Sequence, residues 1–412
     1  MRPVPEKRIY NFERMGFGLF VHYGLYALIG HGEWYLDTRK ISLPEYETLT
    51  KRFTAENFSG EALARMASEA GARYITITTR HHDGFSLYDT KGLSDYDAPH
   101  SAAGRDLIYD FVNGCNKYGI MPMFYHTTLD WRHPLFNSDF HGYLQYLRDS
   151  VKVLCTQYGK IGGLWFDGNW SKPGEDWEED ALYGMIRKCQ PDAMIINNTG
   201  LNARGETGNI EIDSVTFERG RPFSINGDGA RKYLAGEMCQ ILNSHWGYAE
   251  EDFSYRGPEQ FIRELAECRK FGANYLLNIG PEGDGSVRLI DRGIFDIIGR
   301  WTKIYGESLY NVRPAEGVTA SGDSFVLKSD RQGEYFLFVP GLAVLGSGNV
   351  MFAAEHTVPV DVHGFAGCVR EIEWLDSGEK LHFTQDGENL KIDATQYEYG
   401  VNHVVRVARI LV

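Results

Sequence analysis

The sequence predicts an α/β protein in two parts: a (β/α)8-like barrel of the TIM type, regular or irregular, over residues 1–313, and a small antiparallel β-sandwich over residues 314–412. A chain of 412 residues exceeds one ordinary hydrophobic core. From residue 15 to about residue 300, short apolar runs alternate with longer amphipathic segments, as strands and helices do in a barrel. Beyond that point the runs are short and broken by Gly, Asp and Ser, which is typical of an antiparallel sandwich.

The first part contains short, nearly continuously apolar runs, as parallel strands covered on both faces do. Gly71 and Gly119 are placed to end helices, and Pro258 is placed near the first turn of one. A doubly wound open sheet is the competing fold, but no GxGxxG motif follows an early strand, which disfavours its dinucleotide-binding version. The predicted strands are residues 16–24, 72–85, 119–128, 161–170, 192–200, 214–217, 236–242 and 274–279, and the predicted helices are residues 60–71, 106–119, 140–158, 180–189 and 258–271.

The second part is predicted to begin near residue 314, after the segment Asn311-Val-Arg-Pro-Ala-Glu-Gly317. Its apolar residues often alternate with polar ones, as in strands with one face in a core. The predicted strand runs are residues 325–329, 334–340, 349–354, 368–375, 381–387, 390–394 and 401–412.

Charge and composition exclude several classes of partner. The net charge is −14 and Lys and Arg are not clustered, which disfavours nucleic acid. No run approaches the roughly 20 apolar residues that span a bilayer, so no membrane partner is expected. The N-terminal residues lack an apolar signal region and the six cysteines are scattered singly, so a cytoplasmic location is expected, although an exported form with a trimmed signal stays open. The sequence leaves homo-oligomerisation open.

Polar side chains follow several predicted strands directly. His22, Arg80-His-His-Asp83, His126 and Asp167 each come after an apolar run. In a barrel these positions meet at the C-terminal mouth, where active sites are built. We therefore expect a site there.

Asp167 lies in the segment Leu164-Trp-Phe-Asp-Gly-Asn-Trp170. A carboxylate among aromatic residues is costly to bury unpaired. It is either a nucleophile at a strand end or a structural Asp that caps a segment or pairs with an Arg, and its position at the end of a buried barrel strand favours the nucleophile.

The pair His81-His82 has three interpretations: neutral imidazoles that bind sugar hydroxyls, metal ligands, or a surface loop. Neighbouring residues of an extended segment point in opposite directions, so the two rings are not expected to serve one metal. The HxH spacing of barrel metallohydrolases is absent after the first strand, where His22-Tyr-Gly24 stands. No metal and no cofactor are therefore predicted. Glu33-Trp34 suits a sugar site, since Glu accepts hydroxyl protons and Trp stacks, but an exposed loop Glu is the commoner case.

Glycoside hydrolysis needs a second carboxyl group. The candidates after Asp167 fall within 13 residues, and spacing alone selects none of them. They are Glu206, Glu211, Asp213 and Glu218.

These motifs together resemble those of the α-L-fucosidases of glycoside hydrolase family 29, over residues 11 to about 312. The family phrases resembling GxFxHWGxY, GEWY, KHHDGF, YYS…LDW, LWxD, SWGY and LLLNIGPxxDG correspond here to residues 16–26, 32–35, 80–85, 124–131, 164–167, 244–248 and 275–285. Tyr23 replaces the usual Trp of the first phrase, and His126 replaces a usual Ser. The family arginine of NDRW is not at the matching position, where Asn197-Asn-Thr199 stands, and Arg204 is the candidate to take its place.

The resemblance implies a retaining, exo-acting hydrolase of terminal α-L-fucosyl residues on glycans or glycosides. Asp167 matches the family nucleophile. The segment Asp213-Ser-Val-Thr-Phe-Glu218 is the nearest match to the acid/base segment DFxTPE, which indicates Glu218 with Phe217 in place of Pro. Phe20 is expected to hold the C5 methyl group. The other positions that match fucose contacts are His22, Glu33, Trp34, His81, His82, Tyr125 and Trp165.

Two other functions compete with hydrolysis of a fucoside. The altered acid/base segment would suit a barrel that binds fucose but turns it over weakly. The polar strand ends would also suit a metal-dependent barrel hydrolase, which exhaustive chelation would inactivate.

Overall fold

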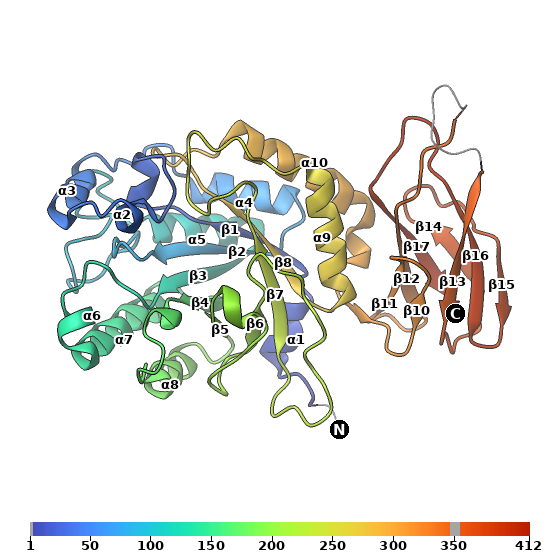
Figure 1. Ribbon diagram of the computed structural model, residues 1–412, viewed down its shortest axis with the longest axis horizontal. Helices are drawn as coiled ribbons and strands as arrows, with labels where there is room; N and C mark the ends of the chain where they lie inside the picture. The colour runs from blue at the N-terminus through green and yellow to red at the C-terminus, as the bar shows by residue number, and fades with distance from the viewer. Residues whose placement is uncertain (1–2, 347–354) are drawn as a thin grey trace. The chain divides into compact units, whose positions relative to one another are not determined.

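The computed structural model describes residues 3–346 and 355–412 (Figure 1). Eight parallel strands form a closed barrel in the order of the chain, and β1 completes it by pairing with β8, with Phe20 opposite Asn278. The strands are β1 Phe17–Val21, β2 Tyr74–Arg80, β3 Met121–Thr127, β4 Gly163–Asp167, β5 Met194–Asn198, β6 Ser214–Thr216, β7 Ala235–Gln240 and β8 Asn274–Ile279. The predicted barrel is confirmed.

Helices alternate with the barrel strands, and Figure 1 shows α4, α5, α7 and α8 outside β1–β5. Ser59 caps α4 by accepting from the N–H of Ala62, and Gly119 ends α5 in the left-handed conformation. The helices are α1 Lys7–Glu13, α2 Tyr35–Thr38, α3 Leu43–Glu47, α4 Gly60–Glu69, α5 Leu107–Tyr118, α6 Leu135–Ser138, α7 Phe140–Gln157, α8 Glu179–Cys189, α9 Pro258–Lys270 and α10 Leu289–Tyr305, with 3-10 turns at Leu25–Leu28, Thr48–Lys51, Asn169–Ser171, Leu201–Ala203 and Gly306–Ser308. The sequence did not predict α1, α2, α3, α6 or α10.

The N-terminal end of the barrel is closed by α1. Its Phe12 packs on Tyr74 at the start of β2, with ring centroids 5.4 Å apart. Its Arg8 reaches Asp213, which is fully buried before β6. With this end closed, the opposite end, where the strands terminate, is the place for a site.

The described residues of the C-terminal part form two antiparallel sheets, in the orders β10-β13-β16-β15 and β14-β17-β12-β11-β9. Trp374, Leu337 and Ile392 are fully buried in its core. The predicted sandwich is confirmed, except that the run at residues 349–354 lies outside the described residues and that β9, β10 and β13 were not predicted. The strands are β9 Val312–Pro314, β10 Thr319–Ala320, β11 Phe325–Ser329, β12 Glu334–Pro340, β13 Thr357–His363, β14 Glu371–Trp374, β15 Phe383–Asp386, β16 Asn389–Thr395 and β17 Val405–Leu411.

Two compact units can be separated within the chain. One comprises the residues up to Arg256 together with Asn274–Asp296, and the other comprises Gly257–Ala273 with Ile297–Val412. The second unit thus includes α9 and the end of α10 as well as the sandwich. The single boundary near residue 314 stays a prediction.

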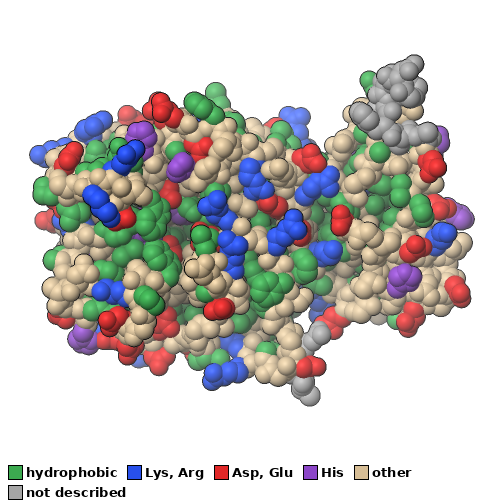
Figure 2. Space-filling view, viewed as in Figure 1, with side chains coloured by type: hydrophobic (Ala, Val, Ile, Leu, Met, Phe, Trp, Pro, Cys, Tyr) green, Lys and Arg blue, Asp and Glu red, His purple; other side chains and the backbone are tan. Residues whose placement is uncertain are grey.

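None of the described helices has the length and apolar composition needed to cross a membrane. On the face drawn in Figure 2, Lys and Arg side chains are interspersed with Asp and Glu. All six cysteines are free thiols.

Candidate active site

Of the polar side chains predicted to meet, His22, His81, His82 and Asp167 gather at the C-terminal ends of the barrel strands. Arg80 and His126 do not, because Arg80 donates to Ser150 of α7 and His126 contacts Thr79. The register of neighbouring strands causes the gathering, because Thr127, Asp167 and Asn198 end β3, β4 and β5 and lie opposite one another in sequence order. His22 and His81 directly follow β1 and β2. Side chains far apart in the sequence therefore share one mouth.

Asp167 is the last residue of β4, and the chain turns sharply after it. Gly168 has φ +123°, and a Cβ there would lie 2.6 Å from the backbone nitrogen of Leu129. Only glycine fits both constraints. The turn presents the Asp167 carboxyl to the mouth, with its side chain 13% exposed and therefore within reach of a ligand.

Four side chains are directed at the Asp167 carboxylate. Trp170 Nε1 and Asn198 Nδ2 donate to Oδ1 at 2.8 and 3.2 Å, and Tyr125 donates its hydroxyl to Oδ2 at 2.9 Å. His82 Nε2 lies 3.4 Å from the same Oδ2. Burial raises the pKa of Asp167, but the interaction with His82 and the hydrogen bonds from Trp170 and Tyr125 outweigh it, so the net pKa is lowered. The group is held as a carboxylate.

Glu218 lies two residues beyond β6 and shares a hydrogen-bond donor with Asp167. Asn198 Nδ2 donates to Glu218 Oε2 at 2.8 Å and to Asp167 Oδ1 at 3.2 Å. The two oxygens that share this donor are therefore at most about 6 Å apart, the sum of these distances, which is compatible with the roughly 5–5.5 Å between the carboxyl groups of a retaining pair. Burial and repulsion from Asp167 raise the pKa of Glu218. The pKa shifts of the two carboxyl groups are therefore opposite in sign.

The other candidates for the second catalytic carboxyl group do not lie beside Asp167 in the same way as Glu218. Asp213 is fully buried and binds Arg8, Arg187 and Lys232 at 3.0, 2.6 and 2.8 Å. Glu211 pairs with the same Arg187 at 3.0 Å. Both are structural ion-pair partners at the other end of the strand from Glu218. Glu206 is exposed.

Two buried histidines, His22 and His81, pack against each other beside the mouth. Asn278 Nδ2 donates to the Trp246 carbonyl, so its Oδ1 faces His22 and accepts the Nδ1 proton at 2.6 Å, which leaves His22 Nε2 as an acceptor. His81 Nδ1 is buried and has no hydrogen-bond partner among the described residues. Burial lowers the pKa of His22 to about 3 and that of His81 well below 6.5, so both rings are neutral.

The expectation that His81 and His82 point in opposite directions is wrong. β2 ends at Arg80, so the alternation of a strand no longer applies, and the two ring centroids lie 4.2 Å apart. His81 packs against Tyr125, and His82 Nδ1 is 2.7 Å from the Thr127 hydroxyl. The two rings thus stand side by side, and only His82 contacts the carboxylate.

Aromatic rings line the mouth on two sides. Trp34 stacks on Trp170, with centroids 5.9 Å apart. Tyr125 stacks on Trp165 at 5.6 Å, and Phe20 packs edge-on against Trp165 at 5.3 Å. Such faces suit the C–H faces and the methyl group of a sugar ring.

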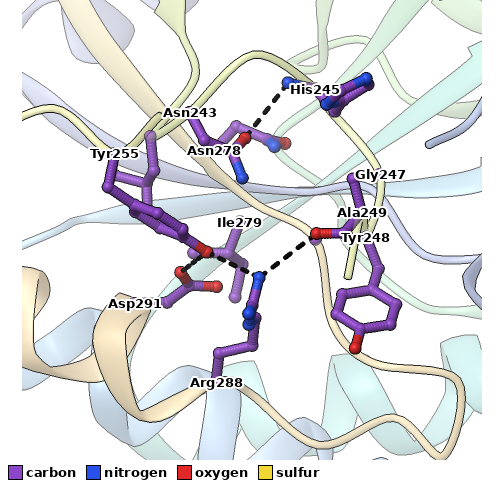
Figure 3. A pocket seen from close by; sticks show the side chains of 12 residues that line it. Asn243, His245, Gly247, Tyr248, Ala249, Tyr255, Asn278, Ile279, Arg288 and Asp291 are labelled. Carbon is purple, nitrogen blue, oxygen red and sulfur yellow. Dashed lines mark hydrogen bonds between the residues drawn. The ribbon is translucent and has the colours of Figure 1, made fainter. Parts of the chain in front are cut away.

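Glu33 is buried rather than exposed, and its Oε2 accepts from the N–H of Gly247 at 2.8 Å. Burial raises its pKa. Gly247 is one of the residues that line a cavity of about 10 Å³, enough for about one water molecule; Figure 3 shows its lining. There Arg288 donates to Tyr255 and to the Ala249 carbonyl, at 3.1 and 3.4 Å, which supports the loop that carries Gly247.

His126, considered as a metal partner, faces away from the mouth. Its ring contacts the Thr79 hydroxyl at 2.9 Å and Tyr88, whereas its neighbour Tyr125 faces inward. Within residues 3–346 and 355–412, no group of three or more His, Cys, Asp or Glu side chains is arranged to hold a metal ion.

The sequence profile of the family described as Alpha-L-fucosidase matches residues 4–307, about three-quarters of the chain. The chain belongs to the alpha-L-fucosidase family. This is family 29 of the glycoside hydrolases, and its curated members include the tissue alpha-L-fucosidases of Bos taurus and Rattus norvegicus. The first is 27% identical over 343 residues, covering 76% of this chain and 70% of the relative, and the second is 28% identical over 342 residues, covering 76% and 71%.

Solved alpha-L-fucosidase structures share the fold. Isoenzyme 1 from Paenibacillus thiaminolyticus is 28% identical, with a TM-score of 0.82 over 98% of both chains. A family 29 enzyme from Bacteroides thetaiotaomicron, trapped as a covalent intermediate with 2-fluoro-fucosyl fluoride, is 21% identical, with a TM-score of 0.82 over 100% of this chain and 97% of the other.

Sequence reasoning missed several residues of this alpha-L-fucosidase site. In the sequence, Asn198 stands out only because the family pattern has NDRW at its place, and Trp170 only as an aromatic neighbour of Asp167. Glu237 carried no signal, because it lies in the middle of β7, where it is fully buried and accepts from Trp165 Nε1 at 2.8 Å and from Tyr74 at 2.5 Å. Burial raises the pKa of Glu237 to about 7.

Proposed function

We propose that this chain is a retaining, exo-acting α-L-fucosidase in which Asp167 is the nucleophile and Glu218 the acid/base. The observation that carries the assignment is the single amide of Asn198, which donates to both carboxyl groups and keeps their oxygens within about 6 Å. The opposite directions of the two pKa shifts support the same roles, because the nucleophile must be ionised while the acid is protonated.

The reaction proceeds in two displacements at the anomeric carbon. In the first, Glu218 gives its proton to the glycosidic oxygen as Asp167 attacks, which forms a fucosyl ester with inverted configuration. In the second, Glu218 takes a proton from water, which displaces Asp167 and inverts the centre again. The product keeps the α configuration.

Binding of the sugar is assigned to the side chains around the nucleophile. His22 and His81, both neutral, have a ring nitrogen available for sugar hydroxyls, and His82 is placed between Asp167 and the ring of Trp34. Glu33 accepts hydroxyl protons, Tyr125 orients the nucleophile, and Phe20 and Trp165 hold the C5 methyl group. The burial of these residues in the floor of the mouth favours a terminal sugar that enters end-on.

Arg204 was expected to replace the family arginine at the fucose. Its side chain is exposed, lies along Gly220 and acts electrostatically on Glu218. We place Arg204 on the side of the leaving group. The cytoplasmic location is part of the proposal and draws support from the six free cysteines.

Kinetics on 4-nitrophenyl α-L-fucoside, compared with the matching galactoside, glucoside and xyloside, test the function. We expect turnover of the fucoside alone, with α-L-fucose as the first product by NMR. Binding of fucose without turnover would support the weakly active binding protein instead, and a β product would contradict the retaining geometry.

A further inference from the structure

Two arginines lie beside Glu218 at the rim of the mouth: Arg204 and Arg219. Both are exposed. Along the described parts of the chain, neither of them forms an ion pair. We call these two residues the arginine rim.

The arginine rim is directed at the acid/base group. Arg219 and Arg204 both act electrostatically on Glu218, where their positive charges oppose the rise in its pKa. The Arg204 side chain is held close to Gly220, since a Cβ on that glycine would lie 2.8 Å from Arg204 Cδ and 3.2 Å from its Nη1. Arg219 has φ +49°, a left-handed conformation that is uncommon for a residue other than glycine.

An exposed aromatic ring borders the same rim. Phe223 is 50% exposed, and its ring meets that of Phe217 edge-on at 5.0 Å. A Cβ on Gly205 would lie 2.7 Å from Phe223 Cζ, so the ring lies over the residue that follows Arg204. An aromatic face beside unpaired guanidinium groups can stack on a sugar ring and bind an anionic substituent on it.

The position of Glu218 identifies which part of the substrate meets this rim. An acid/base group protonates the glycosidic oxygen, so the leaving sugar must lie on its side of the cleaved bond. We propose that the arginine rim and Phe223 form a leaving-group subsite for an anionic sugar, one that carries a sulfate or a carboxylate. This inference rests on the proposed fucosidase function and names the class of substrate.

An anion bound at this subsite would also change the pKa of Glu218. An anion between Arg204 and Arg219 neutralises the two charges that lower the pKa of Glu218. The proton donor would then stay protonated to higher pH with an anionic leaving sugar than with a neutral one.

The test uses three α-L-fucosyl disaccharides, whose second sugar is galactose, 6-sulfogalactose or galacturonic acid. At low ionic strength we expect kcat/KM to favour the anionic disaccharides about tenfold, and the preference to shrink with added salt. In the double variant Arg204→Gln/Arg219→Gln the ratio of anionic to neutral kcat/KM should fall to about one, whereas Arg204→Lys/Arg219→Lys should keep part of it. Comparison of kcat/KM for the 6-sulfogalactose and galacturonic acid disaccharides shows whether the subsite prefers a sulfate or a carboxylate.

The control is Arg65→Gln, which removes one positive charge from an exposed position on α4. It should leave the ratio of anionic to neutral kcat/KM as in the wild type. The subsite proposal is overturned if the wild type shows no preference, or if the double variant keeps it. Failure to hydrolyse 4-nitrophenyl α-L-fucoside would instead overturn the proposed function itself.

Discussion

Replacement of Glu218 by Ala should separate the two steps of the reaction. With a sugar as leaving group, loss of the proton donor should lower kcat/KM by roughly 10²–10⁴-fold, the usual contribution of general acid catalysis. With 4-nitrophenol, which leaves without protonation, the first step should be nearly unaffected. The second step then limits the rate, because no base activates water.

Azide provides the assay that distinguishes the two carboxyl groups, because it attacks without needing a base. In the Glu218→Ala variant it should displace Asp167 from the fucosyl ester after one inversion, so the product is α-fucosyl azide. In Asp167→Gly it should attack the substrate directly and yield β-fucosyl azide. The anomeric coupling in the proton NMR spectrum of each product identifies the configuration.

The shared donor Asn198 is the structural basis of this prediction, since it holds Asp167 and Glu218 within about 6 Å. The matched control is Glu206→Ala, which removes an exposed carboxyl group from the same stretch and should behave like the wild type. The reasoning is refuted if Glu218→Ala yields the β azide or none, or if Glu206→Ala yields the α azide.

Further predictions concern pH, stability and metal. In Asn198→Ala the alkaline limb of the pH profile of kcat/KM should move to higher pH, because the lost hydrogen bond stabilised the charged form of Glu218. Stopped assays from pH 4 to 9 measure this profile, and an alkaline limb at the same or a lower pH would contradict the prediction. The folded-state pKa of Glu237, about 7, lies above its unfolded value of 4.5, so its contribution to stability is complete below about pH 4.5 and is lost as pH rises through 7. Between those pH values the unfolding free energy measured by urea titration should therefore fall by about 3 kcal/mol less in Glu237→Gln than in the wild type. Equal falls in the two proteins would contradict the prediction. Asp213→Ala removes the shared partner of three partly buried cations and should lower the unfolding free energy by about 3 kcal/mol, with no azide rescue of any lost activity; unchanged stability would contradict the ion-pair role. Exhaustive chelation should leave turnover intact, and reactivation by added metal would revive the metal-dependent alternative.

The strands and helices near the nucleophile were predictable because their signals are local. The run before Asp167 is apolar and nearly continuous, as a doubly covered strand must be, and β8 was predicted over its observed residues, Asn274–Ile279. Gly119 indicated a helix end from its residue type alone. By contrast, α2, α3 and α6 have only four or five residues, too few for a helical period to be recognised.

The alternation of strands and helices could be predicted from the amino-acid sequence, and so could the positions of His22, His81 and Asp167 at or just beyond strand ends, since hydrophobic period and length are properties of neighbouring residues. The second carboxyl group that meets Asp167 could be identified only from the three-dimensional fold. Glu211 and Glu218 lie seven residues apart, on either side of β6. Glu211 pairs with Arg187, whereas Glu218 lies at the mouth beside Asn198. The direction in which a strand carries each residue, and the register with its neighbours, depend on how the barrel closes, which no short stretch of sequence encodes.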